Sequence, residues 1–124
     1  MTSRLAIAGA ALLMAAAVAL GAFGAHALKA RLTPDALALW QTAVNYHAWH
    51  ALALLGVGVL GTQFPSARRL EVTAWLFVAG IALFSGSLYA LALGAPRTVG
   101  IVTPFGGVAF ISGWLLLAWT ALKK

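Results

Sequence analysis

Apolar residues fill four long stretches of the chain, and short polar segments separate them. The stretches cover residues 5–28, 36–61, 70–93 and 104–122. A helix crosses the hydrocarbon core of a bilayer with about 20 apolar residues, at a rise of about 1.5 Å per residue. All four stretches are long enough, the fourth only just. The pattern therefore predicts four membrane-spanning helices.

The segments between these stretches carry charge, proline and glycine and are short. The first and second stretches are separated by a segment that contains Lys29, Arg31, Pro34 and Asp35. The later stretches are separated by residues 62–71 and 94–103. Short connections require consecutive helices to run antiparallel. We therefore expect an all-α fold, an integral membrane four-helix up-down bundle, that forms a single membrane domain over residues 1–124.

Composition supports lipid as the surrounding medium. Hydrophobic residues make up 63% of the chain and charged residues 8%, against about 25% charged residues in a soluble domain. The formal charge of +6 comes from eight basic residues against Asp35 and Glu71. The basic residues stand at the ends of apolar runs, as interfacial anchors do, which favours membrane lipids and argues against nucleic acid. The chain has no cysteine, so disulfides and thiolate metal sites are excluded.

The first stretch also fits a cleavable signal peptide, which would leave three helices. It has a basic start, an apolar run and Ala25-His26-Ala27 as a cleavage site. The apolar run is long for a signal peptide, and it carries Gly21 and Gly24 where helices could pack. We therefore expect the first helix to be retained.

Charges on the short loops predict the orientation of the bundle. Lys and Arg are more frequent in the cytoplasmic loops of a membrane protein. The two sides carry Arg4, Arg68, Arg69, Lys123 and Lys124 against Lys29, Arg31 and Arg97. Five basic residues against three favour both termini in the cytoplasm.

Alternating topology brings the unusual residues into one half of the bundle. The first helix ends, the second begins, the third ends and the fourth begins on the same side of the membrane. These half-helices are rich in polar side chains or glycine, whereas the other halves are mainly Ala, Leu, Val and Ile. The expected polar cluster or ligand pocket comprises His26, Gln41, Asn45, Tyr46, His47, His50, Ser85, Ser87, Tyr89 and Thr103.

Helix packing is the simplest role for such residues. Lipid does not drive apolar helices together, so small residues and interhelical hydrogen bonds hold a membrane bundle. The glycines expected at helix contacts are Gly21, Gly24, Gly86, Gly106, Gly107 and Gly113. At 100° per residue, one side of the second helix carries Gln41, Thr42, Asn45, Tyr46, Trp49 and His50. We expect this side to face the bundle.

Thr103-Pro104 predicts the start of the fourth helix. Threonine can accept hydrogen bonds from the free backbone N–H groups of a first turn, and proline at the first position loses no needed donor. Gly106 and Gly107 follow without the lysine of a phosphate-binding loop. We therefore interpret these glycines as packing positions.

Histidines are the only candidates for metal or haem chemistry. His26 and His47 differ in depth by about 13 Å, too far for one metal ion with bonds of about 2 Å. His47 and His50 are three residues apart and could share an ion, but no carboxylate or thiolate lies nearby in the sequence to complete the site. We expect no metal site and no bound cofactor.

Enzymatic and proton-coupled functions lack their usual residues. No Ser-His-Asp set or carboxylate pair can be assembled from the sequence. Ionisable residues inside a span normally mark a proton pathway, whereas Asp35 and Glu71 stand at helix ends. The small four-helix drug exporters of similar length depend on a glutamate in their first helix, which this chain lacks. We expect a non-enzymatic protein.

Four segments resemble a known family of small membrane proteins. They are GAFGAHALK (21–29), TAVNYHAWHALALL (42–55), LFSGSLYALAL (83–93) and IVTPFGGVAFISGWLLLAW (101–119). In this order they are similar to the YgdD-like family, a domain-of-unknown-function family whose eukaryotic relatives are called transmembrane protein 256. The resemblance implies a bacterial inner-membrane protein with four retained helices, and it supplies no activity. It also implies Gln in many members at the position of His47, which argues against a metal role for that residue.

Two functions remain open from the sequence. The first is a small scaffold or accessory subunit, with a membrane protein partner or a homo-oligomer, in which the polar cluster locks the helices together. The second is a binding protein for an apolar cofactor or lipid, such as a quinone or haem, with Trp40 and Trp49 beside the pocket. A filled bundle favours the first function, and a cavity of about 300 Å³ or more at the cluster favours the second.

Overall fold

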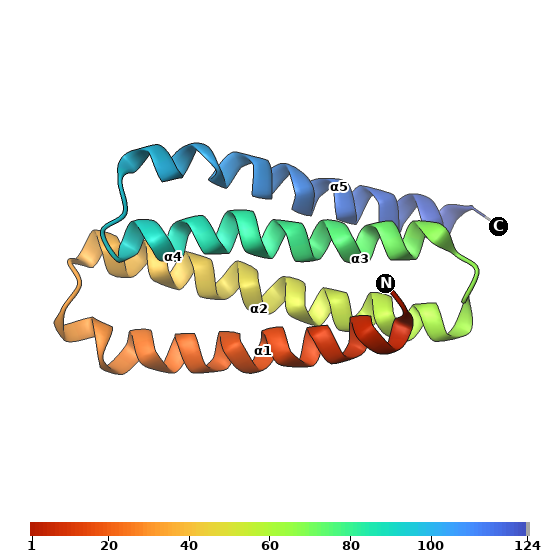
Figure 1. The fold of residues 1–124 in the computed structure, drawn as a ribbon, viewed down its shortest axis with the longest axis horizontal. Coiled ribbons are helices and arrows are strands. Elements are labelled where there is room, and N and C mark those ends of the chain that lie inside the picture. The colour runs from red at the N-terminus through yellow and green to blue at the C-terminus, as the bar shows by residue number, and fades with distance from the viewer. Residues whose placement is uncertain (124) are drawn as a thin grey trace.

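The structure, a computed structural model, describes residues 1–123 and contains four long helices joined by short connections (Figure 1). The third long helix is continuous but consists of two α-helical parts and a π-helical segment between them. In chain order the elements are α1 (Ser3–His26), η1 (Leu28–Ala30), α2 (Pro34–Gln63), α3 (Arg68–Gly80), the π-helical η2 (Ile81–Ser85), α4 (Gly86–Ala92), η3 (Arg97–Ile101) and α5 (Thr103–Leu122).

The all-helical fold expected from the hydropathy pattern is confirmed. Four segments are long and apolar enough to cross a membrane, namely Ser3–Ala30, Pro34–Gln63, Arg68–Ala92 and Arg97–Leu122. The ends of the long helices lie within two residues of the bounds expected from the apolar stretches. Hydropathy therefore located the helices accurately, because the bilayer requires one uninterrupted apolar run for each crossing.

Consecutive long helices run antiparallel (Figure 1). One end of the bundle holds the N-terminus, the end of α5 and the connection 64–67, and we call it the terminal end. The other holds the connections 27–33 and 93–102, and we call it the His26 end. The second and third long helices form the middle of the bundle, with α1 packed chiefly on α2, and α5 chiefly on α3 and η2. Most of the surface of α1 and α5 is therefore left to lipid.

Local sequence signals set several helix ends. The Thr33 hydroxyl accepts a hydrogen bond from the N–H of Ala36 at 3.1 Å, and Pro34 occupies the first turn of α2. After α4, the N–H of Gly94 bonds to the Leu91 carbonyl and that of Ala95 to the Ala90 carbonyl. This pair of hydrogen bonds ends a helix when the residue after the C-cap adopts a left-handed conformation, which favours glycine. Gly94 is that residue, and its φ is +102°.

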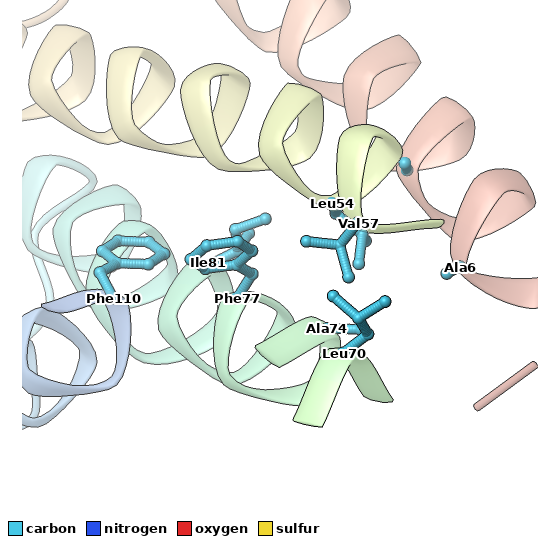
Figure 2. Close-up of a cluster of buried hydrophobic side chains, with 9 residues drawn as sticks. Ala6, Leu54, Val57, Leu70, Ala74, Phe77, Ile81 and Phe110 are labelled. Atoms are coloured by element: carbon cyan, nitrogen blue, oxygen red, sulfur yellow. The ribbon is translucent and has the colours of Figure 1, made fainter. Parts of the chain in front are cut away.

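Two apolar cores fill the interior. The larger one joins all four long helices in the middle of the bundle and toward the terminal end (Figure 2). It contains Ala6, Ala10, Leu54, Val57, Leu70, Ala74, Phe77, Ile81 and Phe110. The smaller core, near the His26 end, contains Leu28, Trp40, Val44 and Ala92.

Glycines let large neighbours approach the helix backbone. A Cβ atom on Gly24 would lie 2.6 Å from Nε1 of Trp40, and one on Gly106 would lie 2.7 Å from Cα of Phe84. Gly113 is covered by Phe77 in the same way, and Gly21 lies against Val44. Three further contact glycines were not expected from the sequence, namely Gly58 against Ile7, Gly61 against Ser3 and Gly80 against Phe110.

Two of the expected packing glycines behave differently. Gly107 meets only the edge of the Phe84 ring, at 3.9 Å from a Cβ built on it. A Cβ atom built on Gly86 would meet no atom of another helix within 4 Å, so the expected close approach of a neighbouring helix at Gly86 is wrong. Its N–H instead bonds to the Ile81 carbonyl five residues earlier and closes the wide turn of η2.

Candidate functional site: a polar cluster inside the bundle

The buried face of α2 only partly matches the expected one, since His50 is buried and Tyr46 packs against the larger core. Its buried polar residues are His47 and His50, and they alternate with small and apolar residues such as Ala43, Ala51 and Leu54. Gln41 and Trp49 are exposed. Because α2 lies between α1 and the third helix, the small residues are needed where the neighbouring backbones come close.

His50 occupies the centre of this face and has partners on three sides. Its Nδ1 lies 2.7 Å from the Tyr46 carbonyl, and its Nε2 lies 3.0 Å from Nε1 of Trp114 on α5. Its ring stacks on Phe110, with centroids 3.6 Å apart and planes inclined by 13°. Phe77 of α3 meets the ring edge-on. His50 thus joins α2 to α3 and α5.

The partners of His50 determine which nitrogen carries its proton. An indole N–H can only donate, and a backbone carbonyl can only accept. Nε2 must therefore accept from Trp114, and Nδ1 must donate to Tyr46. The ring is held as the neutral Nδ1–H tautomer, and a second proton would remove the acceptor that Trp114 uses.

His47 is buried on the other flank of the same face. Its Nδ1 lies 2.8 Å from the hydroxyl of Tyr89 on α4. Tyr89 in turn packs against Trp40, with ring centroids 4.7 Å apart. Nε2 of His47 is buried and has no hydrogen-bond partner among the described residues. It is the one buried side-chain nitrogen or oxygen in residues 1–123 left without a partner.

Serines of the third helix bond to both of its neighbours. The Ser85 hydroxyl, fully buried in η2, donates to the Ala43 carbonyl of α2 at 2.8 Å. Ser87 donates to the Phe84 carbonyl, and its oxygen lies 2.5 Å from the Thr103 hydroxyl of α5. These bonds, with those of His47 and His50, connect three of the four long helices through side chains.

Thr103 does not cap α5, contrary to the expectation. Val102 already has helical angles after η3, and its carbonyl accepts from the N–H groups of Phe105 and Gly106. Because these donors are satisfied by the backbone, the threonine hydroxyl is free to bond to Ser87.

Three expected members lie outside the interior cluster. His26 is exposed at the end of α1. The Gln41 amide donates to the Asn45 side-chain oxygen at 2.9 Å, on an exposed part of α2. Polar side chains one turn apart on a helix can satisfy each other in this way, so Gln41 and Asn45 need no partner in another helix.

Two tryptophans complete the cluster, and neither hydrogen bond was expected from the sequence. Trp114 donates to His50, and Trp40 donates from Nε1 to the Leu20 carbonyl of α1 at 2.9 Å. Buried tryptophans usually find an acceptor for the indole N–H. The tryptophans in the sequence therefore indicated that acceptors exist. They did not identify them, because the acceptors lie 64 and 20 residues away along the chain.

Two cavities of the structure lie away from the cluster. One cavity of about 510 Å³ lies between the N-terminus, the end of α2 and the start of α3, and another of about 600 Å³ lies between the ends of α2 and α5 and the start of α3. Both are at the terminal end. Within residues 1–123, no three His, Asp or Glu side chains come together as a metal site.

Comparisons with known proteins agree with this architecture. Residues 20–107 match the model of a family described as a protein of unknown function, DUF423. The chain belongs to this family. It is 44% identical to the UPF0382 membrane protein YwdK of Bacillus subtilis over 107 residues, which covers 86% of this chain and 87% of the relative.

A second relative extends the match to nearly the whole chain. The UPF0382 inner membrane protein YgdD of Escherichia coli is 40% identical over 129 aligned residues, covering 99% of this chain and 93% of the relative. The resemblance to the YgdD-like family is therefore confirmed, and the chain is a multi-pass inner-membrane protein of this family. No solved structure matches it.

Proposed function

We propose that the protein is a non-enzymatic scaffold or accessory subunit of the membrane, held together by the interior polar cluster. The observation that carries this proposal is the environment of His50. Both of its ring nitrogens are bonded within the chain, one ring face stacks on Phe110, and Phe77 packs edge-on against the ring. A catalytic or ligand-binding imidazole needs a free nitrogen directed at a reaction partner.

The other cluster residues support the same function. Ser85, Ser87, Tyr89 and Thr103 each have a hydrogen-bond partner in the protein. Interhelical bonds of this kind hold membrane helices in register. A rigid bundle with two flanking helices exposed to lipid is suited to a second membrane protein or a second copy of the chain.

A binding protein for a quinone or haem is the second candidate. One observation favours it, which is the unpartnered Nε2 of buried His47. An apolar cofactor requires a cavity beside that nitrogen, whereas the two cavities described above are lined by residues of the terminal end. We therefore rank this function second.

Native mass spectrometry of the protein, extracted gently from its own membrane, tests the choice. The first proposal expects a discrete complex, either with another protein or as a homo-oligomer, and no haem or quinone mass. A monomer that carries one equivalent of quinone or haem would contradict it, and a haem would also give a Soret band. A lone monomer without either group would argue against a stable partner.

We further propose that both termini face the cytoplasm. The terminal end carries Arg4, Arg68, Arg69 and Lys123, and the His26 end carries Lys29, Arg31 and Arg97. Positive charge in short loops is favoured on the cytoplasmic side.

A further inference from the structure

The cavity of about 600 Å³ at the terminal end has two chemically different parts. Its walls are apolar and come from three helices, with Leu60 on α2, Leu70 on α3 and Leu117 on α5. Two cations, Arg69 and Lys123, stand at its edge. Gln63 and Ser66 add neutral hydrogen-bond donors. None of the described lining residues is acidic.

These cations are exposed and available to an outside ligand. Arg69 and Lys123 form no ion pair within residues 1–123, where the N-terminal amine pairs with Glu71. The Lys123 ammonium lies 5.4 Å from the centroid of the Trp119 ring, on the last turn of α5. Tryptophan and lysine together at a helix end are typical of the membrane–water interface.

The depth of the cavity matches a lipid molecule. Arg69 is the second residue of the third span, and Lys123 directly follows α5. Cations at this level meet the phosphate layer, and the leucine walls extend from there into the hydrocarbon. A ligand with an anionic head and an apolar tail would satisfy both parts of the cavity at once.

We propose that this cavity binds one anionic diacyl phospholipid. The phosphate lies between Arg69 and Lys123, and one acyl chain lies against Leu60, Leu70 and Leu117. The neighbouring cavity of about 510 Å³ does not offer the same chemistry, because Glu71 contributes a carboxylate to its lining. Charge complementarity therefore selects the cavity between α2, α3 and α5.

Lipid titration of the full-length protein in a neutral detergent, followed by native mass spectrometry, tests the proposal. The probes are phosphatidylglycerol and a phosphatidylcholine with the same acyl chains. We expect one phosphatidylglycerol to bind at lower concentration than any phosphatidylcholine. The double variant Arg69→Gln/Lys123→Gln should weaken that first binding step about 25-fold, since each interfacial cation contributes about fivefold.

A matched variant controls for the loss of charge. Lys29→Gln/Arg31→Gln removes two exposed cations from the opposite end of the bundle, and it should leave the first binding step unchanged. Equal binding of the two lipids, or equal losses in the two double variants, would overturn the proposal.

A third variant separates lipid from a free anion. Ala121→Trp fills the cavity from α5 and keeps both cations, and it should abolish the one-lipid step. Retained binding in this variant would mean that charge alone attracts lipid at the surface, against the proposal. Competition by millimolar glycerol phosphate would likewise point to a free-anion site and overturn it. Circular dichroism melts show whether each variant is folded. The cavity shares no residue with the interior polar cluster, so the result is independent of the proposed scaffold function.

Discussion

At the scale of single residues, His50 shows how a membrane protein makes use of an imidazole. Its two nitrogens have fixed and opposite roles, one as donor to Tyr46 and one as acceptor from Trp114. An unsatisfied polar group inside a membrane costs several kcal/mol, and the two hydrogen bonds of His50 avoid that cost. The same ring provides a flat surface for Phe110. His47, by contrast, satisfies only one nitrogen.

Replacing His50 tests its contribution to stability. His50→Leu should lower the free energy of unfolding by about 0.6 to 2 kcal/mol, because it removes an interhelical hydrogen bond. Trp114→Phe removes the other partner, and the double variant should lose less than the sum of the two single variants. Unfolding in mixed micelles, followed by circular dichroism, measures these values. Gln41→Leu, which breaks an exposed bond within one helix, is the control. Strict additivity of the His50 and Trp114 effects would show that the bond contributes nothing.

At the scale of helices, the contact of α5 with the third helix depends on glycine. Gly106 lies directly over the backbone of Phe84, whereas its neighbour Gly107 only reaches the edge of the Phe84 ring. Membrane helices gain stability mainly from such close contacts, since lipid tails compete equally well for apolar side chains. The π-helical turn of η2 helps to form this contact, because it contains Phe84 and presents it to α5.

Adjacent glycines of α5 should respond in opposite ways to alanine. A Cβ atom on residue 106 would lie 2.7 Å from Cα of Phe84, so Gly106→Ala must push the helices apart. We expect a loss of about 1–3 kcal/mol in the free energy of unfolding. Gly107→Ala has space for a methyl group, and should be neutral or stabilise by up to about 1 kcal/mol through helix propensity. The same micelle assay compares them, and equal effects of the two substitutions would contradict the described packing.

At the scale of the whole molecule, the two ends of the bundle have different chemistry. The interior cluster of hydrogen bonds extends from the middle toward the His26 end, and the two cavities lie at the terminal end. The terminal end also carries the ion pair between the N-terminal amine and Glu71. One half of the bundle is therefore held by internal hydrogen bonds, and the other contains the two cavities.

Cysteine labelling tests which end faces the cytoplasm. The natural chain has no cysteine, so Ser66→Cys marks the terminal end and Thr98→Cys marks the His26 end without background. In cells with a permeabilised outer membrane and an intact inner membrane, a membrane-impermeant maleimide should label position 98 and not position 66. Disrupting the inner membrane should expose both. Labelling of position 66 alone in intact cells would reverse the proposed orientation, as would a C-terminal reporter fusion active only outside the cytoplasm.

The sequence by itself determined the number of spans, their limits and their alternating direction. These properties depend on local hydropathy and loop length, which any chain in a bilayer must satisfy. The same information placed the polar residues in one half of the bundle, and Thr33-Pro34 marks a helix start from its own residues alone.

Only the tertiary structure decided which faces and which glycines meet. Thr103-Pro104 repeats the pattern of Thr33-Pro34, yet Thr103 bonds to Ser87 because η3 already satisfies the first turn of α5. The face of α2 could not be chosen from the sequence, since polar residues occur on both sides and Gln41 is satisfied by Asn45. In a soluble protein, water would distinguish the two faces by polarity. In a membrane, the lipid and the bundle interior are both apolar. The buried face of α2 is therefore selected by shape and by hydrogen bonds from distant side chains such as Trp114.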